Sequence, residues 1–209
     1  MSPKHIAIAG NIGSGKTTLT QLLSARLDWQ AYYENPDNNP YIADFYVDMP
    51  RWGFNMQVFF LYSRIARIQE IRNGSRHVVQ DRTIYEDVYI FAPTLERMHL
   101  MDLRDYVCYK NLFDQIRPVI QPPDLLIYLQ APGSVLKQRI LSRNREYEQQ
   151  VREDYLDSLN EFYDRWAGEY ALGPKLVYDV ESVDFVNNPD DLERIVRDVA
   201  DCFPDVAIL

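Results

Sequence analysis

The residues most suited to chemistry form a glycine-rich stretch near the start of the chain. Residues 10–17 match the pattern G-x-x-x-x-G-K-[ST], directly after an apolar run and directly before a segment with helical spacing. In such a loop the glycines let backbone N–H groups turn toward phosphates, the lysine neutralises phosphate charge, and the threonine hydroxyl can ligate Mg²⁺. An ordinary glycine-rich turn with a surface lysine is the alternative, which the strand and helix context disfavours. The stretch predicts that a nucleoside triphosphate binds to Gly10, Asn11, Ile12, Gly13, Ser14, Gly15, Lys16, Thr17 and Thr18.

Two further apolar runs end in acids. Residues 76–81 end in Asp81, followed by Arg82, and an acid there suits Mg²⁺ while an arginine suits a transferring phosphate. Glu34 ends another short run, and a carboxylate there can accept the proton of an attacking hydroxyl. A surface ion pair and a solvated strand-end glutamate are the plain alternatives. A nucleoside monophosphate acceptor favours arginine where this chain has Glu34, so the sequence favours a neutral alcohol as acceptor.

These residues require a scaffold that brings strand ends together. Short apolar runs typical of buried strands occupy residues 5–9, 29–34, 76–81, 124–130 and 175–179. Segments with helical spacing occupy residues 16–28, 50–73, 84–97, 101–117, 134–143, 152–170 and 189–203. The alternation predicts an α/β fold, a P-loop NTPase-type parallel five-stranded sheet covered by helices on both faces. Ligands of such folds bind beyond the carboxyl ends of the strands.

The composition of the chain disfavours several classes of binding partner. The 209 residues are 46% hydrophobic and 25% charged, and no repeat or linker divides them, so one domain over residues 1–209 is expected. The formal net charge of −9 disfavours nucleic acid polymers and anionic membranes. No apolar run approaches the roughly 20 residues of a membrane helix. The first residues lack the apolar stretch of a signal peptide, so a cytoplasmic protein is expected. Cys108 and Cys202 lack metal-ligand spacing and are expected to be reduced.

Five motifs together resemble the deoxynucleoside kinase family. They are residues 10–18, 33–36, 51–57, 80–87 and 143–148, in that family's order and approximate spacing. The resemblance implies phosphoryl transfer from ATP, with Mg²⁺, to the 5′-hydroxyl of a deoxynucleoside in nucleotide salvage. It also implies a homodimer packed through helices and a helical lid at about residues 139–150. The implied catalytic residues are Glu34 as the base, Arg82, Lys16, Arg143 and Arg145, with Thr17 and Asp81 at the metal.

The resemblance implies a base pocket on the helix expected over residues 50–73. Gln57 and Arg64 lie seven residues apart and therefore share one helix face, for which a solvated polar stripe is the alternative. In the family, Gln57 would read the base edge, and Arg64 with Asp87 would form the charged end of the pocket. The other substrate-binding residues implied are Trp52, Met56 and Phe91. Ordinary core aromatics are the alternative for Trp52 and Phe91.

Sugar and lid contacts follow from the same resemblance. Tyr46 and Glu148 match the pair that binds the 3′-hydroxyl of the sugar. Tyr147 is a departure, because many relatives carry the second acid of the lid at this point. Outside the glycine-rich loop, the implied ATP contacts are Arg139, Arg143, Asp184 and Phe185. The lid arginines, including Arg145, would place positive charge over the γ-phosphate, and a solvated helix end is the alternative.

The same resemblance favours some deoxynucleosides over others as the phosphoryl acceptor. Asp81 stands where animal relatives often carry glutamate, and Met56 where they often carry an aromatic residue, and both features resemble the bacterial deoxyadenosine and deoxyguanosine kinases. The Arg64–Asp87 pair points to purines or deoxycytidine rather than thymidine. Deoxyadenosine is therefore expected, with deoxyguanosine or deoxycytidine as alternatives. A nucleoside monophosphate kinase and a non-enzymatic P-loop switch are the other hypotheses.

Overall fold

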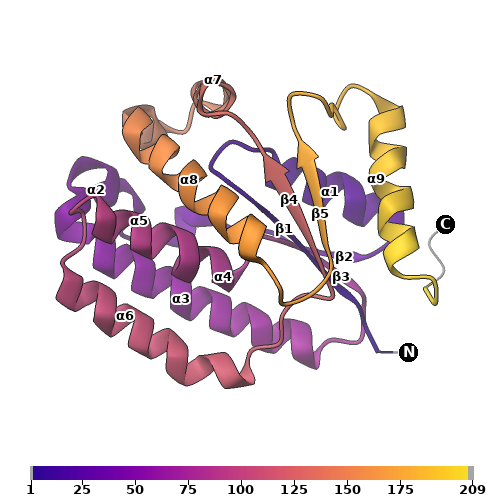
Figure 1. Cartoon of the computed structure of the whole chain (residues 1–209), viewed down its shortest axis with the longest axis horizontal. Coiled ribbons are helices and arrows are strands. Elements are labelled where there is room, and N and C mark those ends of the chain that lie inside the picture. Colours follow the sequence, from indigo (N-terminus) through magenta and orange to yellow (C-terminus); the bar gives the residue numbers. More distant parts are fainter. Residues whose placement is uncertain (1, 207–209) are drawn as a thin grey trace.

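A parallel five-stranded sheet forms the centre of the molecule (Figure 1), in a computed structural model that describes residues 2–206. The strands are β1 (His5–Gly10), β2 (Gln30–Tyr32), β3 (Val78–Asp81), β4 (Leu125–Gln130) and β5 (Lys175–Asp179). Their order across the sheet is β2-β3-β1-β4-β5, and every neighbouring pair is parallel. The predicted α/β fold is therefore confirmed.

Both faces of the sheet are buried, because side chains alternate along each strand. In β1, Ile6 and Ile8 join one hydrophobic cluster while Ala7 and Ala9 join another. Helices α1 (Lys16–Leu27) and α9 (Pro189–Cys202) cover the first face. The second face carries α3 (Met49–Asn73), α5 (Ala92–Arg97), α6 (Leu103–Ile116) and α8 (Glu153–Glu169), which Figure 1 shows on the opposite side of the sheet.

Strand register brings the expected chemistry to one edge. Ile8 of β1 pairs with Asp81, the last residue of β3, and Gly10 pairs with Leu129 of β4. The loop that follows Gly10 therefore starts beside the end of β3. This is the carboxyl edge of the sheet, where ligands of parallel sheets bind.

Several elements differ from the sequence-based expectation. The expected helix over residues 84–97 consists of α4 (Ile84–Glu86), a π-helical turn (Asp87–Phe91) and α5. Helix α2 (Ile42–Val47) and the 3₁₀ turns Pro36–Asn38 and Arg117–Val119 were not predicted. The second strand ends at Tyr32 rather than at Glu34, because β2 lies at the sheet edge and pairs only with β3, over three residues. Glu34 therefore lies on a loop, two residues beyond the strand.

The last elements lie around the carboxyl edge. Helix α7 (Gly133–Arg143) ends at Asn144, whose positive φ of 53° stops the helix. A 3₁₀ turn (Glu146–Gln150) follows and leads into α8. Among residues 2–206, no helix is both long and apolar enough to cross a membrane.

Candidate active site

The glycine-rich loop joins β1 to α1 in a conformation that depends on its glycines. Gly13 and Gly15 have φ values of 85° and 101°, in the left-handed region that L side chains rarely adopt. A Cβ on Gly13 would also lie 2.9 Å from the Leu136 carbonyl oxygen. Asn11 ties the loop to α8, because its Nδ2 donates to the Leu156 carbonyl at 3.0 Å and to Asn160 Oδ1 at 2.7 Å. The loop thus presents the N-terminus of α1 as an anion site.

Lys16 is buried at the start of α1. Its Nζ donates to the Asn11 carbonyl at 3.0 Å, so the side chain lies along the loop. Burial and the nearby Arg82 lower the pKa of Lys16 to about 8, although Asp81, Glu86 and Glu34 oppose this. A bound anion favours the charged form of this lysine.

Asp81 and Thr17 form an oxygen pair that suits a hard cation. Thr17 Oγ1 donates to Asp81 Oδ2 at 2.5 Å, and the buried Asp81 Oδ1 has no hydrogen-bond partner among the described residues. Burial raises the pKa of Asp81, so a neighbouring cation would favour its ionised form. Residues 2–206 hold no group of three or more acids, histidines or cysteines that is placed to bind a metal ion. Mg²⁺ fits the pair, because it binds through one or two protein oxygens together with substrate phosphates.

Glu34 is held by two arginines. Its Oε2 accepts from Arg82 Nε at 2.8 Å, its Oε1 accepts from Arg64, and Arg64 Nε also donates to Asp87 Oδ2 at 3.0 Å. Burial alone would raise the pKa of Glu34, but Arg82, Arg64 and Lys16 lower it to about 2. Burial raises the pKa of Asp87 to about 6 against the opposite pull of Arg64. Glu34 is therefore ionised at neutral pH and acts only as an acceptor.

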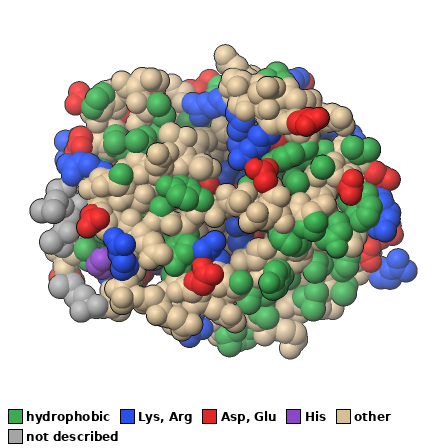
Figure 2. All heavy atoms as spheres, turned by 180° about the vertical axis from the view of Figure 1, so that it is seen from behind, with side chains coloured by type: hydrophobic (Ala, Val, Ile, Leu, Met, Phe, Trp, Pro, Cys, Tyr) green, Lys and Arg blue, Asp and Glu red, His purple; other side chains and the backbone are tan. Residues whose placement is uncertain are grey.

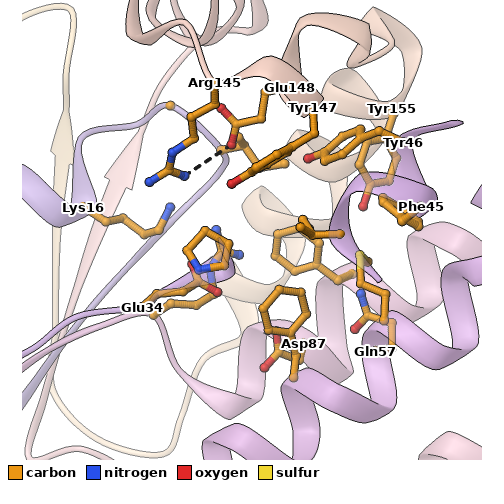
Figure 3. Close-up of a pocket in the computed structure, with 18 of the residues that line it drawn as sticks. Lys16, Glu34, Phe45, Tyr46, Gln57, Asp87, Arg145, Tyr147, Glu148 and Tyr155 are labelled. Carbon is orange, nitrogen blue, oxygen red and sulfur yellow. Dashed lines mark hydrogen bonds and ion pairs between the residues drawn. The ribbon is translucent and has the colours of Figure 1, made fainter. Parts of the chain in front are cut away.

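A cavity of about 700 Å³, counting space open to solvent, lies between the loop and α3. This volume is typical of small-molecule sites. Figure 3 shows Lys16 and Glu34 on one side of it, Gln57 and Asp87 below, and Tyr46, Tyr147 and Glu148 above. The structure brings together at its wall the predicted residues Ile12, Gly13, Lys16, Thr17, Glu34, Tyr46, Met56, Gln57, Arg82, Asp87, Phe91, Arg143, Arg145 and Glu148. On the molecular face in Figure 2, Lys and Arg side chains gather along a hollow, although the protein as a whole is acidic.

Gln57 provides the main polar group at the deep end of the cavity. Its side chain is buried beside Met56, Phe60 and Phe91, and its Oε1 has no partner among the described residues. A buried acceptor without a donor is unfavourable by about 1–3 kcal/mol, so a ligand that donates to it gains affinity.

Two expected contacts lie outside the cavity wall. Trp52 stacks on Tyr41 with ring centroids 5.6 Å apart, and is not among the lining residues. Its place on α3 directs it toward the preceding segment, not toward the cavity beside Gln57. Arg64 lies behind the wall and contacts the site through Glu34 and Asp87.

The segment after α7 closes the cavity from above. Glu148 accepts from Arg143 Nε at 2.8 Å and from Arg145 Nη1 at 3.4 Å. Tyr147 donates its hydroxyl to Asp37 Oδ1 at 2.5 Å and stacks on Tyr46 at 5.8 Å. The segment is therefore tied to the loop after β2 and to α2, across the mouth of the cavity.

The other expected ATP contacts lie behind the loop. Arg139 Nη1 donates to the Ser14 carbonyl at 3.2 Å. Phe185 is buried so close to Gly15 that a Cβ there would lie 3.2 Å from its ring. Asp184 is exposed and accepts from the Asn187 backbone N–H at 3.0 Å. Thr18 is exposed on the first turn of α1. This region therefore joins the loop to the turn before α9.

Sequence reasoning missed several residues of the site. The apolar wall includes Ile42, Phe45, Phe60 and Tyr155, of which the first two lie on the unpredicted α2. Glu86 is fully buried and accepts from the Gly10 N–H at 3.2 Å. The spacing of Thr83 and Glu86 is that of a capping box, which is the one local signal that could have drawn attention to Glu86.

A phosphate loop that faces an ionised carboxylate and a nucleoside-sized cavity defines a P-loop phosphotransferase. The sequence profile of the family described as "Deoxynucleoside kinase" matches residues 6–204. The deoxyadenosine/deoxycytidine kinase of Bacillus subtilis is 36% identical over 97% of this chain and 95% of that protein. The deoxyguanosine kinase of Lactobacillus acidophilus is 31% identical over 98% of this chain and 92% of that protein. A structure of deoxyadenosine kinase from M. mycoides with dCMP and dCDP bound gives a TM-score of 0.85 at 27% identity, over 94% of this chain and 99% of that one.

The chain therefore belongs to the deoxynucleoside kinase family, as its motifs predict. It is an enzyme that phosphorylates deoxynucleosides. The relatives divide between deoxyadenosine, deoxycytidine and deoxyguanosine as named acceptors.

Proposed function

We propose that this enzyme transfers the γ-phosphoryl group of ATP to the 5′-hydroxyl of a deoxynucleoside in nucleotide salvage, with deoxyadenosine as the preferred acceptor. The observation that carries the proposal is the Glu34 carboxylate, which Arg64 and Arg82 hold ionised at the cavity wall it shares with Lys16 and Gln57. A neutral hydroxyl can donate to this carboxylate, whereas a monophosphate would be repelled by it.

The donor side supplies positive charge to the phosphates. The loop N–H groups and Lys16 bind the triphosphate, and Arg143 and Arg145 approach it from the segment above. Thr17 and Asp81 would hold Mg²⁺, which supplies further neutralisation of phosphate charge when bound. The transition state of phosphoryl transfer is loose, so positioning and charge neutralisation by these side chains provide most of the rate.

The acceptor side orients the hydroxyl. Glu34 accepts a hydrogen bond from the 5′-hydroxyl and takes its proton as the bond to phosphorus forms. Its pKa of about 2 makes it a weak base, so its larger contribution is orientation of the nucleophile. Tyr46 and Glu148 line the same cavity and are suited to the 3′-hydroxyl of the sugar.

The deep end of the cavity favours bases that carry an amino group. Gln57 Oε1 lacks a donor, and Asp87 is mostly ionised at neutral pH with a pKa of about 6. Two acceptors suit the N6 amino group of adenine or the N4 amino group of cytosine better than O6 of guanine. The relatives named as deoxyadenosine kinases support adenine as the base.

Substitution of Gln57 by leucine tests this proposal. We expect Gln57→Leu to raise KM for deoxyadenosine by about 10- to 100-fold. The base would lose its hydrogen bonds to the amide oxygen and the amide NH₂ group of Gln57. KM for ATP should stay unchanged. Gln69→Leu, on an exposed position of the same helix, is the matched control. The three nucleosides deoxyadenosine, deoxyguanosine and deoxycytidine are compared in steady-state kinetics of the unmodified enzyme. A kcat/KM that is highest for deoxyguanosine or deoxycytidine would contradict the preference for deoxyadenosine.

We also propose that two copies of the chain form a homodimer through α3 and α6. Exposed hydrophobic side chains gather there, and Figure 2 shows hydrophobic atoms over its lower right part, where these helices lie. They are Tyr62 on α3, Leu103, Val107 and Leu112 on α6, and Val119 in the turn that follows α6. An apolar surface of this kind is typical of a subunit interface.

Sedimentation equilibrium tests the dimer. The unmodified protein should sediment at twice the chain mass of 24.6 kDa, and Val107→Glu should sediment as a monomer. Leu172→Glu, at an exposed position outside these helices, should remain a dimer. A monomeric unmodified protein at tens of micromolar would overturn the proposal.

A further inference from the structure

Arg82 has a left-handed backbone conformation, which is unusual for an arginine. Its φ is 67°, in the left-handed region where residues other than glycine are uncommon. Its side chain is buried, with Nε donating to Glu34 and the guanidinium 4.5 Å from the centre of the Phe91 ring. Such a conformation persists only where surrounding groups hold it.

Hydrogen bonds to Glu86 hold the backbone next to Arg82 in this conformation. Its Oε2 accepts from the N–H of Thr83, the residue directly after Arg82, at 2.6 Å. Its Oε1 accepts from the Tyr163 hydroxyl at 2.8 Å and from the Gly10 N–H at 3.2 Å. The Tyr163 hydroxyl in turn accepts from Arg82 Nη1 at 3.3 Å. These bonds close a ring that starts and ends at Arg82, and the first glycine of the phosphate loop is bonded to this ring through Glu86.

We propose that Glu86 and Tyr163 are positioning residues that hold Arg82 and the phosphate loop in a fixed relation to each other. The acceptor side of the reaction depends on Arg82, and the donor side on the loop that starts at Gly10. The ring joins the two directly. This inference rests on the role proposed above for Arg82, which holds Glu34 ionised beside the acceptor hydroxyl.

A capping role alone does not account for Glu86. A capping box needs one oxygen of the glutamate, here the bond to Thr83, and leaves the other to solvent. Glu86 is instead fully buried, and its second oxygen accepts from two groups that belong to β1 and α8. Burial of a carboxylate is costly, and its hydrogen-bonded donors here are all neutral. Its negative charge favours the charged forms of Lys16 and Arg82, which gives the burial a functional reason.

The position of the Tyr163 hydroxyl is fixed by packing. The ring stacks on Tyr128 at 5.8 Å with an interplanar angle of 8°, and its edge meets Phe91 at 6.2 Å. Removal of the hydroxyl alone therefore leaves the ring in place, so Tyr163→Phe isolates the hydrogen bonds.

The test compares two buried tyrosines. Tyr163→Phe should lower kcat by about threefold to tenfold, which corresponds to the loss of one or two hydrogen bonds. KM for ATP and for deoxyadenosine should stay unchanged within twofold. Tyr109→Phe is the matched control, since that hydroxyl is equally buried and has no partner among the described residues. Its kcat should equal that of the unmodified enzyme. Melting temperatures measured alongside separate a catalytic loss from a loss of folded protein.

Glu86→Gln gives a second, independent measurement. It should lower kcat by about tenfold or more, because the amide retains the size but loses the charge and part of the acceptor capacity. The double variant Glu86→Gln/Tyr163→Phe should lose no more than Glu86→Gln alone, because both changes break one ring. Additive losses, or equal losses in Tyr163→Phe and Tyr109→Phe, would overturn the inference.

Arg82→Lys separates this inference from the proposed function. A large kcat loss in Arg82→Lys with an unchanged kcat in Tyr163→Phe and Glu86→Gln would refute the positioning role while the role of Arg82 stands. An unchanged kcat in Arg82→Lys would refute both.

Discussion

Glu34→Gln is expected to lower kcat by about 10² or more while ATP still binds with unchanged affinity. The amide keeps the size of the side chain but carries no charge and cannot take the proton of the 5′-hydroxyl. Glu34 lies on the same side of the cavity as Lys16, but its hydrogen bonds go to Arg64 and Arg82 rather than to the phosphate loop, so ATP binding should be preserved. Initial rates of ADP formation with deoxyadenosine, together with ATP binding by calorimetry, give both quantities.

A control variant and the pH dependence of folding stability provide two further checks on the role of Glu34. Glu70→Gln removes an exposed glutamate of α3 that pairs with Arg67, and should leave kcat unchanged. Because arginines lower the pKa of Glu34 to about 2, its ionised form stabilises the fold at pH values above the ordinary 4.5. That contribution is lost as the pH falls toward 2, so Glu34→Gln should also lower the melting temperature at pH 7. A near-normal kcat in folded Glu34→Gln would refute the base assignment.

Lys16→Met is expected to lower kcat/KM for ATP by about 10³ or more. Methionine approximates the length of the lysine stem but removes the charge that neutralises the β and γ phosphates. The loss should be visible in both ATP affinity and turnover, because the lysine contacts the triphosphate before and during transfer. Lys4→Met is the matched control, since Lys4 precedes β1 at the opposite end of the sheet and pairs with Asp124. Comparable kcat/KM values for Lys16→Met and Lys4→Met would contradict the prediction.

The same lysine predicts the alkaline limit of the unmodified enzyme. Its pKa in the free protein is lowered to about 8, so kcat/KM for ATP should fall about tenfold per pH unit above that value. The groups that face it are Arg82, which favours the neutral form, and Asp81, Glu86 and Glu34, which favour the charged form. Bound ATP raises the pKa, so kcat at saturating ATP should fall only at higher pH. A kcat/KM for ATP that stays level to pH 9.5 would contradict this.

Local patterns predicted the scaffold because each of its elements carries its own signal. The apolar run before Gly10 and the helical spacing after Lys16 identify the strand and helix around the phosphate loop, and the structure has both. Parallel register then brings Asp81 beside Ile8, two residues before Gly10. Helix α2 escaped prediction because it is only six residues long and follows a stretch rich in Asn and Pro.

Contacts between distant segments could not be read from such patterns. Tyr163 and Glu86 are 77 residues apart, and nothing near either residue indicates that they meet. Trp52 illustrates the opposite case, since the motif around it suggested a wall of the base pocket while its ring stacks on Tyr41. The direction of a side chain on a helix depends on the elements that pack against it, which a single segment does not specify.

The central claim is that the acceptor is a neutral deoxynucleoside hydroxyl that faces Glu34. The most direct measurement is ADP formation from MgATP with deoxyadenosine and, separately, with dAMP, under otherwise identical conditions. We predict that ADP forms at a rate proportional to enzyme with deoxyadenosine and that dAMP gives only the background rate. ADP formation with dAMP and none with deoxyadenosine would contradict the assignment of Glu34 and the acceptor site built around it.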